Sequence, residues 1–231
     1  MRIWDIHPGY LSQSRLLEEC RDLDAVVARL HGNNEHDSQD PEVLRWTDYG
    51  WAIKHRQKKL VCEMALRGDE NTSVINTQSN TQNFEIWPSV YIDKPDVQIA
   101  LLKEHYINKE TGRIVLPNNG QVLWSQHKYS ILARDPNRYK MFGKMVATQS
   151  VSFETLALEL VDLLRVPPSE GGIRNALQHM WGHVSDVSEQ QGCIDKWSLQ
   201  KLLLCIQENV KKSNEPYLTN STALSDLMVW L

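Results

Sequence analysis

Residues 12–32, SQSRLLEECRDLDAVVARLHG, carry the clearest fold signal of the chain. Apolar side chains recur there at three- and four-residue steps, which is the spacing of one buried helix face. They are Leu16, Cys20, Leu23, Val27 and Leu30. Ser12 or Ser14 can cap the start of this helix, and Gly32 ends it. The stretch therefore predicts a long amphipathic helix, with Asp22 at the flank of its buried face.

The rest of the chain repeats this helical pattern, and no stretch alternates as a β-strand does. Further helices are expected from Pro41, over 51–67 before Gly68, from Asp93 or Lys94, and over 121–134, 136–149, 152–166, 172–186, 196–212 and 221–231. Residues 69–86 are polar and rich in turn formers, which favours a long mobile loop. The sequence predicts an all-α fold, a compact helical domain with an appended helical C-terminal region.

The charge balance changes along the chain and suggests a domain boundary. Residues 1–148 contain 19 basic and 19 acidic side chains, whereas residues 149–231 contain 6 and 10. Segment 101–148 alone contains 8 basic and 3 acidic side chains, and such a local excess can attract phosphates. We therefore expect two domains, at 1–148 and 149–231.

Several classes of protein are disfavoured by the sequence. No apolar stretch approaches the roughly 18 residues of a membrane span, so no membrane partner is expected. Asp5 and the turn at 7–9 interrupt any signal-peptide core. The four cysteines lack C-x-x-C spacing, and two lie on apolar helix faces, which favours reduced thiols in a cytoplasmic protein.

The amino terminus offers a reactive group. An α-amino group has a pKa of about 7.7–8.0, so much more of it is uncharged at neutral pH than of a lysine. It can attack an aldehyde-like carbon and form a Schiff base. Arg2 disfavours removal of Met1, so the amine would be that of Met1. The alternatives are that the first residues only pack on the fold, and that Asp22 only pairs with a helix-surface arginine.

Three segments, in order, resemble the pyrimidine-dimer DNA glycosylase family, the group of phage endonuclease V. Arg2-Ile3 and Arg21-Asp22-Leu23 match the family's start and first helix without a gap, where the family has Glu in place of Asp22. Residues 53–68, IKHRQKKLVCEMALRG, resemble its second long helix, and 138–144, RYKMFGK, its aromatic, lysine-rich segment. The resemblance covers about residues 1–146, with 69–120 poorly matched.

This resemblance implies a DNA-repair glycosylase and AP lyase that excises damaged, pyrimidine-dimer-like bases. The Met1 amine would be the nucleophile and the Asp22 carboxylate would stabilise the developing positive charge. The partner would be double-stranded DNA with damaged bases or abasic sites, and no metal or cofactor is required. The basic side chains expected to contact DNA are Arg2, Arg15, Arg21, Lys128, Arg134, Lys140 and Lys144. Trp87 and Tyr91 are candidates for a lid or base wedge, or for a hydrophobic cluster.

The C-terminal part, about residues 127–231, resembles a helical bacterial domain of unknown function, from which no activity can be carried over. His179 and His183 have the i, i+4 spacing of a metal-binding pair, but no third ligand is evident. Two rival functions remain open from the sequence. One is a non-catalytic helical module that binds nucleic acid or protein on the same scaffold. The other is an interaction protein dominated by its acidic tail.

Overall fold

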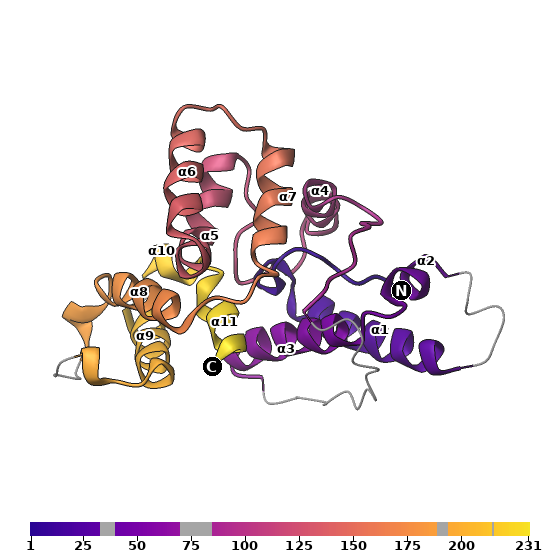
Figure 1. Ribbon diagram of the computed structural model, residues 1–231, viewed down its shortest axis with the longest axis horizontal. Coiled ribbons are helices and arrows are strands. Elements are labelled where there is room, and N and C mark those ends of the chain that lie inside the picture. Colours follow the sequence, from indigo (N-terminus) through magenta and orange to yellow (C-terminus); the bar gives the residue numbers. More distant parts are fainter. Residues whose placement is uncertain (33–39, 70–84, 189–193, 214) are drawn as a thin grey trace. The chain divides into compact units, whose positions relative to one another are not determined.

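The computed structural model describes residues 1–32, 40–69, 85–188, 194–213 and 215–231. Within these ranges the chain forms eleven α-helices, four short 3-10 helices and no β-strand, which confirms the all-α expectation (Figure 1). The α-helices are α1 (Gln13–His31), α2 (Pro41–Trp46), α3 (Gly50–Arg67), α4 (Pro95–His105), α5 (Gly120–Arg134), α6 (Pro136–Ala147), α7 (Phe153–Leu163), α8 (Glu170–Trp181), α9 (Leu199–Ser213), α10 (Pro216–Thr219) and α11 (Ala223–Asp226). The 3-10 helices are η1 (Pro8–Tyr10), η4 (Ser185–Val187), η5 (Ile194–Lys196) and η6 (Leu227–Trp230).

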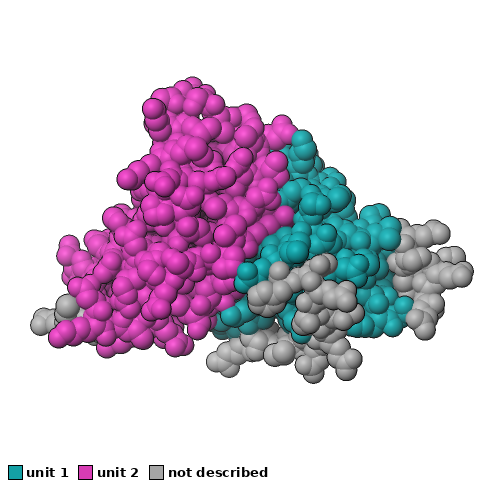
Figure 2. Space-filling model, in the orientation of Figure 1, with its two compact units in different colours: residues 1–112 teal, residues 113–231 magenta. Residues whose placement is uncertain are grey.

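The chain divides into two compact units (Figure 2), unit 1 at Met1–Gly112 and unit 2 at Arg113–Leu231. The position suggested by charge, near residue 148, falls in the turn between α6 and α7, inside unit 2. Helices α6 and α7 each pack against α5, and this packing keeps residues on both sides of 148 in one unit. Charge describes the solvated surface, whereas compact units follow the buried contacts.

Helix α1 forms as its sequence predicts. The Ser12 hydroxyl accepts a hydrogen bond from the Arg15 amide and caps the helix, and Gly32 is the residue after its end. Leu16, Leu23 and Val27 are buried, and α1 packs beside α3 in unit 1 (Figure 1). A charged side chain, Glu19, is buried on this same face. Packing along the whole helix therefore sets the position of Asp22, which lies at the flank of this buried face.

Helix α3 ends as expected, at Gly68, which has the left-handed φ of 86° that favours glycine. The side chains of α3 differ from a simple amphipathic pattern. Arg56, Lys59 and Glu63 are all buried, and the ion pair between Glu63 and Arg67 lies at 2.9 Å. The polar residues of α3 therefore contribute to the interior of unit 1.

Helix α5 is the centre of unit 2 and packs against α6, α7, α8 and α11. Its approach to α8 is close, because a Cβ atom added at Gly172 would lie 2.0 Å from the Ala133 carbonyl oxygen. A glycine at this position allows the first turn of α8 to lie against the end of α5. The buried Tyr129, Ile131 and Phe142 contribute to the apolar core of unit 2.

The sequence also leads us to expect a long loop at 69–86 and no membrane span. Most of the expected loop at 69–86 lies outside the described residues. Among the helices that the structure describes, none is long and apolar enough to cross a membrane.

Candidate functional site

The first residues form an extended segment whose backbone amides are bound by four side chains from three helices of unit 1, α1, α2 and α4. The Arg2 amide donates to Asp22 Oδ2 at 2.8 Å and the Ile3 amide to Glu42 Oε1 at 3.0 Å. The Trp4 amide donates to Glu19 Oε1 at 3.1 Å, and those of residues 5 and 6 both donate to Oε1 of Gln98. Buried backbone amides need acceptors, and side chains provide them here in place of a neighbouring strand.

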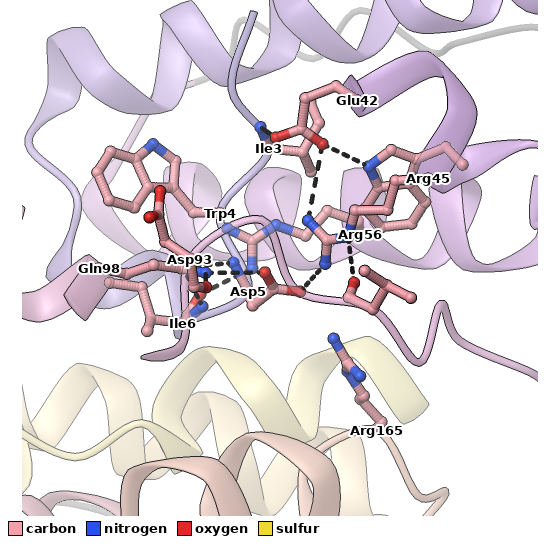
Figure 3. A network of polar contacts seen from close by, with 12 residues as sticks. Ile3, Trp4, Asp5, Ile6, Glu42, Arg45, Arg56, Asp93, Gln98 and Arg165 are labelled. Carbon is pink, nitrogen blue, oxygen red and sulfur yellow. Dashed lines mark hydrogen bonds and ion pairs between the residues drawn. The ribbon is translucent and has the colours of Figure 1, made fainter. Parts of the chain in front are cut away.

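Arg45 lies at the centre of this network (Figure 3). Its guanidinium binds the Asp5 carboxylate, lies 3.6 Å from Glu42, and donates to the carbonyl oxygen of Val90 at 2.8 Å. The indole of Trp46 donates to the second oxygen of Glu42 at 3.1 Å. Burial raises the pKa of Glu42, while the Ile3 amide and Arg45 oppose this change. The network thus joins the N-terminal segment to α2 and to the segment before α4.

A second buried pair supports the same segment from α1 and α3. Arg56 donates to both carboxylate oxygens of Glu19, at 2.7 and 2.9 Å, and to the Ile6 carbonyl oxygen at 2.9 Å. Burial raises the pKa of Glu19, and the adjacent guanidinium of Arg56 lowers it in opposition. Such a bidentate pair is geometrically specific. It fixes the amide of Trp4 and the carbonyl of Ile6 at the same time.

Met1 and Asp22 are brought close together by this arrangement. Only two carbons separate the Met1 and Arg2 nitrogens, so these atoms are at most about 4 Å apart. Because Asp22 Oδ2 accepts from the Arg2 amide, the Met1 amine lies within about 7 Å of that oxygen. Met1 is 39% exposed and Asp22 is partly buried. An amine that can approach a carboxylate in this way can combine nucleophilic attack with proton transfer.

Arg2 extends from this site with its guanidinium held on two sides. The group lies 4.4 Å from the centre of the Trp4 ring and 2.7 Å from Asp93 Oδ2. The side chains of Arg2 and Asp93 remain 34% and 32% exposed. The backbone of Asp93 is held as well, because its carbonyl oxygen accepts from Gln98 Nε2 at 2.8 Å (Figure 3).

Two models of known protein families match parts of the chain. Residues 1–79 match the model described as pyrimidine dimer DNA glycosylase. The chain therefore carries a pyrimidine dimer DNA glycosylase domain. A second model, a protein of unknown function (DUF1722), matches residues 128–226. No curated protein and no solved structure matches the chain.

Both resemblances drawn from the sequence are thereby confirmed, although the glycosylase match ends at residue 79 and the expected resemblance extended to 146. The match includes α1, α2 and α3, which provide Asp22, Glu19, Glu42 and Arg56. Gln98 and Asp93, which bind the same N-terminal segment, lie beyond the matched residues.

Two further arginines expected to contact DNA, Arg15 and Arg21, lie on α1 in different surroundings. Arg15 lies two turns before Asp22 on α1 and pairs with Glu18 at 2.9 Å. It lines a polar cavity of about 370 Å³ together with His105 and Lys109. Arg21 is exposed on α1. The Arg15 side chain is 27% exposed and Arg21 is exposed, so both arginines reach the surface, as contact with a phosphate requires.

Arg134, in the DUF1722 region, does not fit the expected DNA contact. Its guanidinium pairs with Asp226 at 2.7 Å, and the two side chains are 0% exposed. It also donates to the carbonyl oxygens of Ser130 and Val166. The expectation is corrected on this point, because a guanidinium buried and bonded in this way is not available to a phosphate.

The lysines of the DUF1722 region are more accessible. Lys140 and Lys144 are exposed on α6. The Lys128 amine lies 4.6 Å from the centre of the Tyr129 ring and 4.2 Å from that of Tyr217, and burial lowers its pKa. These lysines belong to unit 2, whereas Met1, Arg2 and Asp22 belong to unit 1. The structure therefore assembles the expected amine and carboxylate, and places these lysines in the other unit.

Trp87 joins an aromatic cluster in unit 1. Its ring lies 6.4 Å from Trp46, 6.1 Å from Trp51 and 5.6 Å from His55, with edge-on geometry in each case. Tyr91 faces the guanidinium of Arg45 at 5.8 Å. Of the alternatives for Trp87, the hydrophobic cluster is the one that these contacts support.

Metal ligands do not gather in the parts of the chain that are described, where no three His, Cys, Asp or Glu side chains could hold an ion together. His183 instead accepts or donates a hydrogen bond at 2.7 Å with the Tyr129 hydroxyl and stacks on Tyr217. Its ring is thus occupied by aromatic neighbours.

Sequence reasoning missed the residues that hold the N-terminal segment. Glu19 was hidden among the apolar positions of α1, and its place on the buried face was the available signal. Glu42, Arg45, Asp93 and Gln98 gave no local signal, since each acts on a segment far away in the sequence.

Proposed function

We propose that this protein is a DNA-repair glycosylase with AP-lyase activity that uses the Met1 amine as its nucleophile. One observation carries the proposal. The carboxylate of Asp22 binds the amide of residue 2, so that the amine of the exposed residue Met1 lies within about 7 Å of a carboxylate in a glycosylase-family domain.

In the proposed reaction the amine nitrogen bonds to C1′ of a damaged nucleotide, and the bond from C1′ to the base breaks. The base leaves with the electron pair and takes up a proton. Opening of the sugar ring and loss of the remaining nitrogen proton give an imine. Loss of a C2′ proton then expels the 3′ phosphate and cuts the strand. Asp22 stabilises the positive charge at C1′ and transfers protons between these steps.

Double-stranded DNA with damaged bases or abasic sites is the proposed partner. Arg2, Arg15 and Arg21 would contact its phosphates from unit 1, and Lys128, Lys140 and Lys144 from unit 2. We propose a cytoplasmic location, which suits the thiols of Cys20, Cys62 and Cys205. Burial raises the pKa of the Cys20 thiol to about 11, which keeps it protonated at neutral pH.

Borohydride trapping on abasic-site DNA tests the proposal. The full chain should form a covalent adduct, and peptide mapping should place it on the nitrogen of Met1. Asp22→Asn should preserve the hydrogen bond from the Arg2 amide, because its amide oxygen can accept, and should slow strand cleavage about 10²–10⁴-fold.

Three controls make the result decisive. Intact mass of the protein establishes that Met1 is retained with a free amine, and acetylation of that amine should abolish the adduct. Asp22→Glu restores the longer carboxylate of the family and tests whether side-chain length limits the rate. DNA binding without an adduct would favour the non-catalytic module, and unchanged cleavage by Asp22→Asn would remove Asp22 from the mechanism.

A further inference from the structure

We propose that the Asp93 carboxylate occupies the position of a DNA backbone phosphate, and that it holds Arg2 until such a phosphate displaces it. The inference rests on the proposed function for the identity of the ligand. It adds Asp93, which lies outside the family match, to the site. It also adds a competition between the Asp93 carboxylate and a phosphate for Arg2, which controls how strongly the site binds DNA.

The chemistry of the two anions is alike. An arginine guanidinium binds carboxylates and phosphates through the same donors, often in a bidentate manner. Asp93 Oδ2 lies 2.7 Å from the Arg2 terminal nitrogen, which is the position that a phosphate oxygen would need. The guanidinium also lies over the ring of Trp4, which is itself buried. Trp4 can therefore keep the guanidinium in place while its anion is exchanged.

The pair is weak enough to exchange. Both side chains are about one-third exposed, and ion pairs of this kind contribute little to stability. In contrast, the backbone of Asp93 is fixed, since Gln98 binds its carbonyl oxygen and also accepts from the amides of residues 5 and 6. The carboxylate can thus rotate away without moving the segment, and it returns to Arg2 when the phosphate leaves.

This competition predicts that removing the charge of Asp93 strengthens DNA binding. The dissociation constant of the full chain for an undamaged duplex, measured by fluorescence anisotropy at low salt, should fall about two- to fivefold in Asp93→Asn. Asp93→Glu keeps the charge and should bind as the unchanged protein does. Asp24→Asn removes one negative charge from the exposed part of α1 in the same unit, and it should change the constant less.

A double-mutant cycle connects the effect to Arg2. Arg2→Gln keeps a large residue at position 2, so that Met1 is retained, and it removes the guanidinium. In this background Asp93→Asn should no longer tighten binding. An equal gain with and without Arg2, an equal gain from Asp24→Asn, weaker binding by Asp93→Asn, or no binding of DNA by any of these proteins would each overturn the inference.

The trapping assay, applied to the same proteins, separates this inference from the proposed function. If the cycle gives the expected result and no Met1 adduct forms, the competition at Arg2 stands and the imine chemistry is wrong. If the adduct forms and Asp93→Asn has no effect on affinity, the chemistry stands and the competition is wrong. Thermal melting of each variant checks that a loss of binding is not a loss of folding.

Discussion

The two units of this protein bury ion pairs for different purposes. In unit 1 the pair of Glu19 and Arg56 binds the backbone of the extended N-terminal segment as well as joining α1 to α3. In unit 2 the pair of Arg134 and Asp226 joins α5 to α11 and binds carbonyl oxygens near the end of α7. The pair in unit 1 orders an extended segment that has no neighbouring strand. The pair in unit 2 joins helices whose backbone hydrogen bonds are already made within each helix.

The two pairs differ in what they hold, which is an extended segment in unit 1 and helices in unit 2. A helix satisfies its own backbone, whereas an extended buried segment depends on acceptors from elsewhere. Charged residues in a core give little net stability, because their desolvation opposes their attraction. We therefore infer that the charged interior of unit 1 holds the first residues in one position, whereas the buried pair of unit 2 does not act on them.

The largest effect should come from breaking each pair on its basic side. Arg56→Met leaves the buried Glu19 without its cation, and Arg134→Met does the same to Asp226. Each should lower the free energy of unfolding by about 3–5 kcal/mol, because an uncompensated buried charge remains. Urea denaturation of the two variants measures this loss.

Trapping on abasic-site DNA, under conditions in which both variants are folded, then distinguishes the two pairs. Arg56→Met should lose the Met1 adduct, because the N-terminal segment is released. Arg134→Met should retain it. Equal adduct formation by the two variants would show that the pair in unit 1 does not position the amine.

The sequence predicted the helices well because their signals are local. Ser12 caps α1, Gly68 ends α3, and Pro95 and Pro136 each begin a helix, and all of these act within a few residues. The division into two compact units has no such local signal, because it depends on how α5 packs with its neighbours.

A second prediction concerns pH and unit 2. Burial lowers the pKa of His127 from 6.5 to about 4, and its Nδ1 lies 2.8 Å from the Leu123 carbonyl oxygen. The folded state therefore favours the neutral ring. The stability that this contributes is complete above pH 6.5 and is lost as pH falls toward 4, by about 3 kcal/mol at most.

Urea denaturation across this pH range measures the effect, with His127→Gln as the reference. The difference in unfolding free energy between the two proteins should change with pH in the stated direction. A difference that stays constant would mean that the pKa of His127 is the same in the folded and unfolded states.

A third prediction compares two adjacent glycines at the start of α8. A Cβ at Gly172 would meet the Ala133 carbonyl oxygen, whereas a Cβ at Gly171 would meet nothing within 4 Å. Gly172→Ala should therefore destabilise the protein by about 1–3 kcal/mol through overpacking against α5. Gly171→Ala should be neutral or slightly stabilising by thermal melting. Similar melting temperatures for the two would contradict the close approach of α8 and α5.

The candidate site was predictable only in part. Met1, Arg2 and Asp22 follow from a short ungapped stretch of sequence, and the structure places them together. Glu42 and Gln98 could not be found in this way, since their contacts cross 39 and 93 residues of sequence. Arg134 shows the opposite error, because a basic residue in a basic segment is not always at the surface.

The smallest expected effect concerns the exposed lysines of α6, which contrast with Arg134 in the preceding helix. Lys140 and Lys144 are exposed, and each would contribute about one phosphate contact. Replacing either with alanine should leave stability almost unchanged and reduce the slope of log affinity against log salt by about 0.9. Lys201→Ala, on α9, removes a lysine that is exposed beside Trp197 and serves as the control of equal charge. If all three variants change the slope equally, the effect is one of net charge and α6 has no particular place on DNA. If only the α6 variants change it, unit 2 takes part in binding DNA through an exposed helix, whereas unit 1 would do so through residues fixed by its charged interior.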